Sequence, residues 1–163
     1  MCFIQYLCLQ IYNEYNMESQ PVQAKEALTH HGISLSRPRI AIFQYLQEHK
    51  THPTADEIYH ALHGTIPTLS PATVYNTLWL FAEKHLCLSL TINEKRICFD
   101  GQTHPHGHFL CTHCGAIHDI AIEILPIKVG DTLKNGHQVC EAHYYYKGIC
   151  AQCISSGFTA KTI

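Results

Sequence analysis

Apolar residues recur every three or four positions in four segments of the N-terminal half, which predicts four helices. The expected helices cover residues 22–31, about 37–48, 55–62 and a segment that begins at Pro71. Start signals support two of them, since Thr54 and Glu57 have the spacing of a capping box and Ser70 precedes a proline. On the last helix, the apolar face would leave four residues turned outward: Thr73, Tyr75, Asn76 and Trp79.

The period of the pattern then changes from about 3.6 to 2, which indicates strands. Leucine or isoleucine occupies positions 86, 88, 90 and 92, and residues 96–100 return after a turn at Asn93 and Glu94. Helices followed by a hairpin are typical of a winged helix, whose last helix enters the major groove of DNA. A generic small α+β core fits this pattern equally well, so the pattern alone does not assign a function.

Residues 101–108 (GQTHPHGH) are rich in turn formers, and we expect a hinge there. Beyond it, apolar runs at 109–110, 116–120 and 138–146 predict strands, while Pro126 and Gly130 interrupt a helical pattern at 122–133. The expected fold is therefore α+β, with an N-terminal winged helix-turn-helix domain and a C-terminal α/β domain. The expected division is a disordered extension at 1–16, a winged helix at 17–100, the hinge at 101–108 and the second domain at 109–163.

Composition narrows the classes of function. The net charge is −2, so any affinity for DNA must come from local clustering of basic residues and from doubling in a dimer. No apolar run approaches the roughly 18 residues of a membrane span, and no membrane partner is expected. The chain holds nine cysteines and fourteen histidines, which points to metal binding. Cysteine thiolates as ligands imply a reducing compartment, and hence the cytoplasm.

Two Cys-x-x-Cys pairs, Cys111 with Cys114 and Cys150 with Cys153, would supply four thiolates. Four sulfurs make a closed tetrahedral site, so we expect one structural Zn²⁺ per chain that stabilises the C-terminal domain. Redox-active dithiols, or a chance pattern, are the alternative interpretation. The remaining cysteines are expected to be small apolar residues rather than ligands. They stand at positions 2, 8, 87, 98 and 140.

A second group of ligand-type residues surrounds the hinge. His106 and His108 would point to the same face of an extended strand, and Asp100 ends the hairpin just before them. Asp119 follows the first cysteine pair, and His52 precedes the capping box. Three imidazoles and two carboxylates would suit Fe²⁺ or Mn²⁺, although Zn²⁺ also accepts such ligands. Spacing does not exclude five other histidines: His104, His113, His118, His137 and His143.

Four motifs resemble the ferric uptake regulator family. They are HPTADEIY at 52–59, SPATVYNTL at 70–78, HxHxxCxxCG at 106–115 and GICxxC at 148–153. The resemblance runs from about residue 22 to 155 and implies a metal-dependent transcriptional repressor, not an enzyme, that binds double-stranded operator DNA as a homodimer. It also implies that His52, Asp100, His106, His108 and Asp119 form one regulatory Fe²⁺ or Mn²⁺ site per chain.

Within the family, the chain looks most like the peroxide-sensing repressors, because Asp119 stands where iron-uptake regulators usually carry glutamate. That likeness implies that hydrogen peroxide oxidises a ligand imidazole, at His52 or His106, and that DNA is then released. It further implies DNA contacts from six residues: Tyr75, Asn76, Arg37, Arg39, Lys84 and Arg96. Trp79 departs from the arginine that relatives commonly carry at that position.

Three other functions remain open on the sequence. An iron- or zinc-uptake regulator of the same family would share the fold and the DNA binding but would sense metal supply. A small metalloenzyme would need an open coordination position and a general base, and no HExxH-type motif is present. A zinc-ribbon interaction module would account for the cysteines but not for the histidines and aspartates around the hinge.

Overall fold

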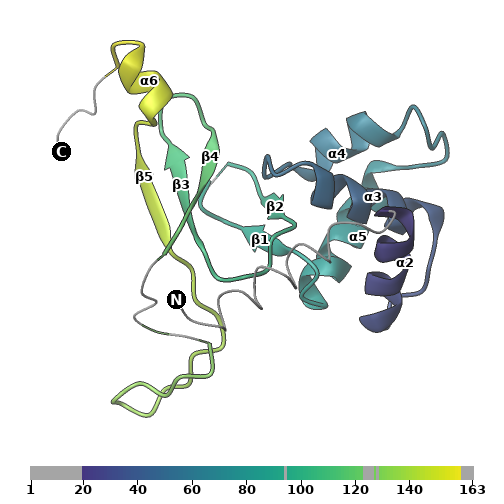
Figure 1. The fold of residues 1–163 in the computed structure, drawn as a ribbon, viewed down its shortest axis with the longest axis horizontal. Coiled ribbons are helices and arrows are strands. Elements are labelled where there is room, and N and C mark those ends of the chain that lie inside the picture. The colour runs from purple at the N-terminus through teal and green to yellow at the C-terminus, as the bar shows by residue number, and fades with distance from the viewer. Residues whose placement is uncertain (1–19, 94, 123–126, 128, 159–163) are drawn as a thin grey trace, which may run out of the picture.

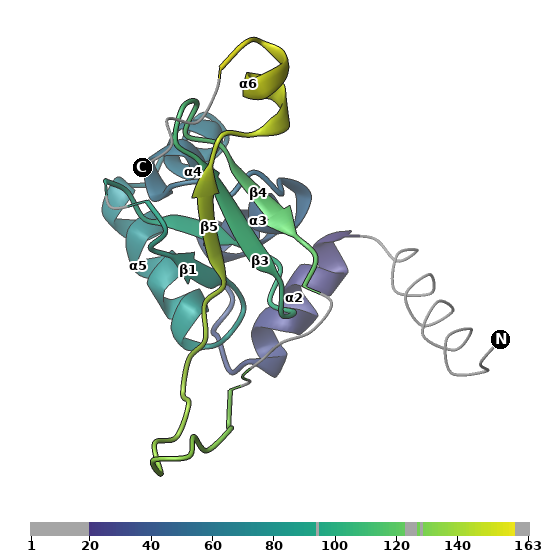
Figure 2. The same ribbon diagram turned by 90° about the vertical axis from the view of Figure 1, so that its left-hand side faces the viewer.

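The computed structural model describes residues 20–93, 95–122, 127 and 129–158 (Figure 1). The expected extension at residues 1–16 lies outside this part of the chain. Helices fill one side of the molecule and a three-stranded sheet lies on the other, with a two-stranded sheet between them (Figures 1 and 2). Among the described residues, no helix has the length and apolar character needed to cross a bilayer.

Four helices occupy the described residues of the N-terminal part, as the sequence predicts. They are α2 (Gln20–His30), α3 (Arg37–Glu48), α4 (Ala55–Leu62) and α5 (Pro71–Glu83). The start signals are confirmed: Thr54 and Glu57 form a complete capping box, and the Ser70 hydroxyl accepts from the backbone of Thr73 at 3.1 Å. The helices close over one core, in which Ile42 and Leu78 are fully buried.

The hairpin that follows completes the winged helix. Strand β1 (Leu88–Leu90) pairs antiparallel with β2 (Cys98–Asp100), and Leu88 lies opposite Asp100. Phe99 on β2 packs into the helical core, whereas Leu90 and Cys98 form a second small core with Leu110 of the other sheet. The hairpin therefore joins the two halves of the molecule, and the expected α+β fold is confirmed.

The second sheet has the strand order β4-β3-β5. Strand β3 (Gly107–Cys111) lies in the centre, antiparallel to β4 (Ile117–Ile120) and parallel to β5 (Tyr145–Gly148). Helix α6 (Ala151–Ser155) follows β5 and has no counterpart in the pattern of the sequence. Strand β3 begins at Gly107, inside the segment that the sequence predicts to be the hinge.

One strand prediction is wrong. Of the apolar run at 138–146, only the last two residues belong to β5, and Gln138 makes a single bridge to Thr132. Both views show this stretch of chain extending beyond the sheet, and its first residues bond back to 130–133, where the Gly130 N–H donates to the Val139 carbonyl at 2.8 Å (Figures 1 and 2). Within 122–133, none of the described residues is helical, which fits the interruptions that Pro126 and Gly130 predict.

Candidate metal centres

The four cysteines of the two Cys-x-x-Cys pairs come together beyond the end of the second sheet. Cys111 ends β3 opposite Gly148 of β5, so the second pair starts only two residues beyond that contact. The Cys111 and Cys153 sulfurs lie 3.9 Å apart, and so do the sulfurs of Cys114 and Cys150. Disulfide sulfurs would be about 2.05 Å apart. A tetrahedron with metal–sulfur bonds of 2.3 Å has edges of about 3.8 Å, so these spacings fit a Zn²⁺ site.

The charges of these thiols also favour a cation. Backbone N–H groups, first that of Cys114, lower the pKa of the Cys111 thiol to about 5. Burial, together with the neighbouring thiols, raises the pKa of Cys153 to about 12. One sulfur is therefore an anion at neutral pH while another resists ionisation. A bound divalent cation would remove that resistance, because it compensates the negative charge of all the thiolates.

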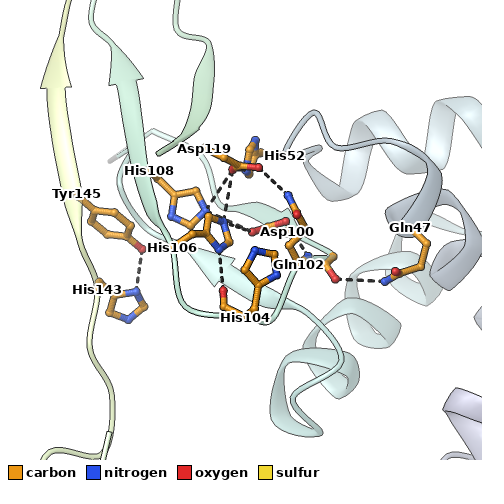
Figure 3. Close-up of polar contacts among 11 residues, drawn as sticks. Gln47, His52, Asp100, Gln102, His104, His106, His108, Asp119, His143 and Tyr145 are labelled. Carbon is orange, nitrogen blue, oxygen red and sulfur yellow. Dashed lines mark hydrogen bonds and ion pairs between the residues drawn. The ribbon is translucent and has the colours of Figure 1, made fainter. Parts of the chain in front are cut away.

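The second cluster unites the residues named from the sequence. Within the described residues, one ligand atom from each of the five lies within 4.8 Å of all the others: His52, Asp100, His106, His108 and Asp119. Asp100 ends β2, His108 lies opposite Asp119 on β3 and β4, and His106 immediately precedes β3. Figure 3 shows these side chains converging between the sheet and the helices.

His52 reaches this cluster from the loop before α4. The Phe99 N–H on β2 donates to the Pro53 carbonyl at 2.9 Å, which holds the loop beside the end of the hairpin. His52 itself has a φ of 53°, a conformation that a non-glycine residue adopts only when its surroundings enforce it. Its side chain is 2% exposed, and its Nε2 lies 2.7 Å from Asp119 Oδ1 on β4.

The ligand atoms of this cluster lie close together, but they do not satisfy one another's hydrogen-bonding capacity. His106 Nε2 lies 2.9 Å from Asp100 Oδ2 and 3.4 Å from Asp119 Oδ1. Although these contacts are short, no described group makes a properly directed hydrogen bond to either ring nitrogen of His52 or to His106 Nε2. Buried polar atoms are rarely left without a partner, so ligand atoms that converge in this way fit a binding site for a cation. The mixed nitrogen and oxygen set suits Fe²⁺ or Mn²⁺.

Burial and hydrogen bonds set the protonation states of His52, Asp100 and His106 to those that bind a metal ion. Burial lowers the pKa of His52, even though Asp100 and Asp119 oppose the change, so the imidazole is neutral. Burial acts to raise the pKa of Asp100, but hydrogen bonds from His108 and from the Gln102 backbone outweigh it and hold the pKa below its usual value. The Nδ1–H of His106 can donate to the His104 carbonyl at 2.7 Å, which leaves Nε2 as the lone-pair donor.

Gln102 is a residue of this site that sequence reasoning missed. Its backbone N–H donates to Asp100 Oδ1 at 2.9 Å, and its side-chain amide donates to Asp119 Oδ2 at 2.6 Å. A glutamine in a polar hinge carries no pattern that would single it out. Of the other histidines near the hinge, His104 packs its ring beside that of His106, and His143 pairs with Glu141.

The six residues expected to contact DNA fall on several surfaces. Tyr75 and Asn76 are exposed on α5, and Lys84 is exposed at its end. Arg37 donates to the Thr65 carbonyl at 2.9 Å, and Arg39 donates to Ser34. Arg96 lies on a different surface, beside α4 and the first cysteine pair.

Arg96 pairs with Glu57 of α4 at 3.7 Å and donates to the carbonyl of Gly115, beside the first cysteine pair, at 3.3 Å. Trp79, the departure from the expected arginine, packs its ring edge-on against Tyr75 and Phe99. It therefore links the surface of α5 to the hairpin.

Known proteins resemble this chain in both sequence and fold. The chain is 36% identical over 137 residues to the peroxide operon regulator of Bacillus subtilis, a match that covers 80% of this chain and 91% of that protein. It is 40% identical over 106 residues to the peroxide-responsive repressor PerR of Staphylococcus aureus, covering 65% and 69% of the two chains. The crystal structure of the Campylobacter jejuni peroxide stress regulator superposes with a TM-score of 0.58 at 26% identity, covering 84% of this chain and all of that one.

The sequence model of the ferric uptake regulator family matches residues 30–153, a range that contains both metal centres and the winged helix from α3 onward. The resemblance noted in the motifs is thus confirmed over most of the chain. On this evidence, the chain belongs to the ferric uptake regulator family.

Proposed function

We propose that this protein is a metal-dependent transcriptional repressor that binds operator DNA as a homodimer in the cytoplasm and responds to hydrogen peroxide. One observation carries the proposal: the buried His52, from the loop before α4, lies 2.7 Å from Asp119 on β4 in a cluster of metal-ligand residues. The repressors at 36–40% identity that this chain resembles are named for their response to peroxide.

The proposed regulatory site is the five-residue cluster of His52, Asp100, His106, His108 and Asp119, and the proposed structural zinc site is the four cysteines. The regulatory ligands come from both sides of the hinge at 101–108. Binding one ion to all of them would favour one arrangement of the winged helix relative to the second sheet, because only that arrangement brings His52 to Asp119. In a dimer, this arrangement sets the spacing of the two α5 helices, and so whether both reach successive half-sites.

The proposed DNA surface includes the exposed Tyr75 and Asn76 on α5, a helix whose start is held by Ser70. Arg37, Arg39, Lys84 and Arg96 are proposed to assist through the phosphate backbone. Since the chain carries a net charge of −2, the affinity would depend on the geometry of the dimer rather than on bulk charge.

Bound Fe²⁺ would mediate cleavage of the O–O bond of hydrogen peroxide, and the ligand imidazole would supply the two electrons of the net reaction. In the net reaction, one peroxide oxygen is added to a ring carbon of His52 or His106 and the other leaves as water. An oxidised imidazole is a poor ligand, so the site would lose one of its ligands, the link between the winged helix and β4 would weaken, and DNA would be released. Mn²⁺ would hold the same arrangement of ligands without this oxidation.

Metal analysis and DNA-shift assays of the purified protein test the proposal. We expect one zinc per chain that resists mild chelation, a second exchangeable ion, and DNA binding that requires Fe²⁺ or Mn²⁺. The His52→Ala variant should keep the zinc and lose metal-dependent DNA binding, whereas His60→Ala, at an exposed position on α4, should behave as the wild type.

Peroxide chemistry distinguishes this function from its nearest alternative. The Fe²⁺-loaded protein exposed to dilute peroxide should gain the mass of one oxygen atom on the peptide that holds His52 or His106, and should release DNA. The Mn²⁺-loaded protein should do neither. If DNA binding depends on the metal but no oxygen is gained, the protein is an iron- or zinc-uptake regulator instead.

A further inference from the structure

Gln102 is hydrogen-bonded to both carboxylates of the regulatory cluster (Figure 3). Its backbone N–H reaches Asp100 Oδ1 at 2.9 Å, and its side-chain Nε2 reaches Asp119 Oδ2 at 2.6 Å. Each carboxylate therefore has one oxygen that accepts a hydrogen bond from Gln102. Asp100 belongs to the winged helix and Asp119 to the second sheet, so one residue touches both halves of the site.

The oxygens that Gln102 leaves free are the ones that face the histidines. Asp100 Oδ2 lies 2.9 Å from His106 Nε2, and Asp119 Oδ1 lies 2.7 Å from His52 Nε2. A carboxylate has two oxygens on opposite sides of one carbon, so holding one of them sets the direction of the other. Gln102 thus orients one oxygen of each aspartate toward the point where the imidazoles converge.

The backbone that carries Gln102 is itself anchored to the helices. The Gly101 carbonyl accepts from the Gln47 side chain, at the end of α3, at 3.2 Å. A Cβ on residue 101 would stand only 2.7 Å from the Leu46 carbonyl oxygen, so this close approach requires glycine. The hinge is therefore held against the winged helix on one side, and the Gln102 amide bridges to β4 on the other.

We propose that Gln102 is a positioning residue that presents the two carboxylates to the regulatory metal ion, each through a single oxygen. It also connects the hinge to β4 before any metal binds, which reduces the rearrangement that binding requires. This proposal rests on the proposed function of the five-residue cluster as a metal site. Partners in the outer shell of a metal site typically contribute about 10- to 100-fold to metal affinity.

The test compares metal binding to the zinc-loaded wild type and to Gln102→Leu, which keeps much of the bulk of the side chain but has no donor. We expect Mn²⁺ to bind the variant about 10- to 100-fold more weakly. We also expect the visible absorption spectrum of Co²⁺ in this site to change, because the freed Asp119 carboxylate can bind through a different set of oxygens. Gln138→Leu, at an exposed glutamine in the 130–139 turn, is the matched control and should bind as the wild type.

A second variant separates hydrogen bonding from shape. Gln102→Glu has nearly the same shape but places an acceptor beside the Asp119 carboxylate, so it should alter the Co²⁺ spectrum. It provides the same test if the leucine variant loses its zinc or unfolds.

Wild-type Mn²⁺ affinity together with an unchanged Co²⁺ spectrum in either folded variant would overturn the role of Gln102. If the wild type itself binds no second ion, or if His52→Ala binds Mn²⁺ as tightly as the wild type does, the proposed function fails instead.

Discussion

Burial in the helical core changes the pH at which a side chain ionises, and Cys87 shows this clearly. Its thiol is 2% exposed and its sulfur lies 3.7 Å from the Leu78 carbonyl. Burial, with a smaller effect of Asp100, raises the pKa of this thiol to about 12. The cysteine is therefore a neutral apolar residue of the core, as the sequence predicts for the cysteines outside the two pairs.

The raised pKa of Cys87 predicts how stability changes with pH. In the unfolded chain the thiol ionises near its usual pKa of 9.0, whereas in the folded chain it stays protonated up to about 12. Between these values the unfolded state binds fewer protons, so the free energy of unfolding should fall by about 1.4 kcal/mol per pH unit from this group. The contribution is fully present below pH 9.

Urea unfolding of the wild type and of Cys87→Ala from pH 8 to 10.5 measures this term, because other groups that titrate in the range are common to both proteins. The wild type should lose stability more steeply above the usual pKa of the thiol. Parallel curves for the two proteins would show that the Cys87 thiol ionises equally well in the folded state.

At the scale of single elements, helix α4 supports the metal cluster through its first turn. Thr54 Oγ1 accepts from the Glu57 backbone at 3.2 Å, and the Glu57 carboxylate accepts from the Thr54 backbone at 2.7 Å. This capping box fixes the N-cap of the helix, Thr54, two residues after His52. The approach of His52 to Asp119 thus depends on a local signal that is visible in the sequence.

Thr54→Ala should lower the free energy of unfolding by about 1 kcal/mol, because it removes the cap of α4. It should also weaken binding of the exchangeable metal, since the loop that carries His52 loses a support. Chemical denaturation and Mn²⁺ titration measure the two effects. Thr51→Ala, at an exposed position outside the helix, should change neither. A loss of stability with unaltered Mn²⁺ affinity would show that the cap does not position His52.

The elements differ in how far the sequence predicts them. Helices α3, α4 and α5 carry caps within their own first turns, and the two strands of the wing hairpin, β1 and β2, are neighbours in the sequence, so local signals suffice for them. Strand β5 is different, because it pairs with β3 more than thirty residues earlier and is parallel to it. The apolar run at 138–146 does not indicate where that pairing begins, so the sequence predicts a strand that starts too early in the chain.

The same distinction applies to the candidate site. The four cysteines follow from spacing alone, and His106 and His108 follow from the period of a strand. His52 does not: its place beside Asp119 depends on the hydrogen bond between Phe99 and Pro53, which joins segments far apart in the sequence. The resemblance to the family identified it where spacing could not. Neither residue spacing nor the resemblance identifies Gln102, because its role arises only from contacts formed by the folded hinge.

At the scale of the whole molecule, the described residues join the two halves outside the regulatory cluster through a small apolar core and a few polar contacts. Leu90 and Cys98 of the hairpin meet Leu110 of the sheet in a small core, and Arg96 reaches Glu57 and the Gly115 carbonyl. The ion pair is half exposed, and pairs of that kind contribute about 0–1 kcal/mol. Metal binding at the cluster would therefore be a large part of what holds the halves in one arrangement.

Hydrogen exchange with and without Mn²⁺ tests this coupling across the hinge. At about 100 times its dissociation constant, a ligand stabilises the bound state by about 2.7 kcal/mol, which slows exchange through site-breaking openings by about 100-fold. In the wild type we expect protection on both sides, in the loop at 51–54 and in β4. In His52→Ala, Mn²⁺ at the same concentration should leave the loop unprotected, because no ligand remains there, while the zinc-bound end of the sheet is unchanged. Equal protection of the loop in both proteins would mean that the ion does not join the two halves through His52, and the proposed mechanism of repression would fail with it.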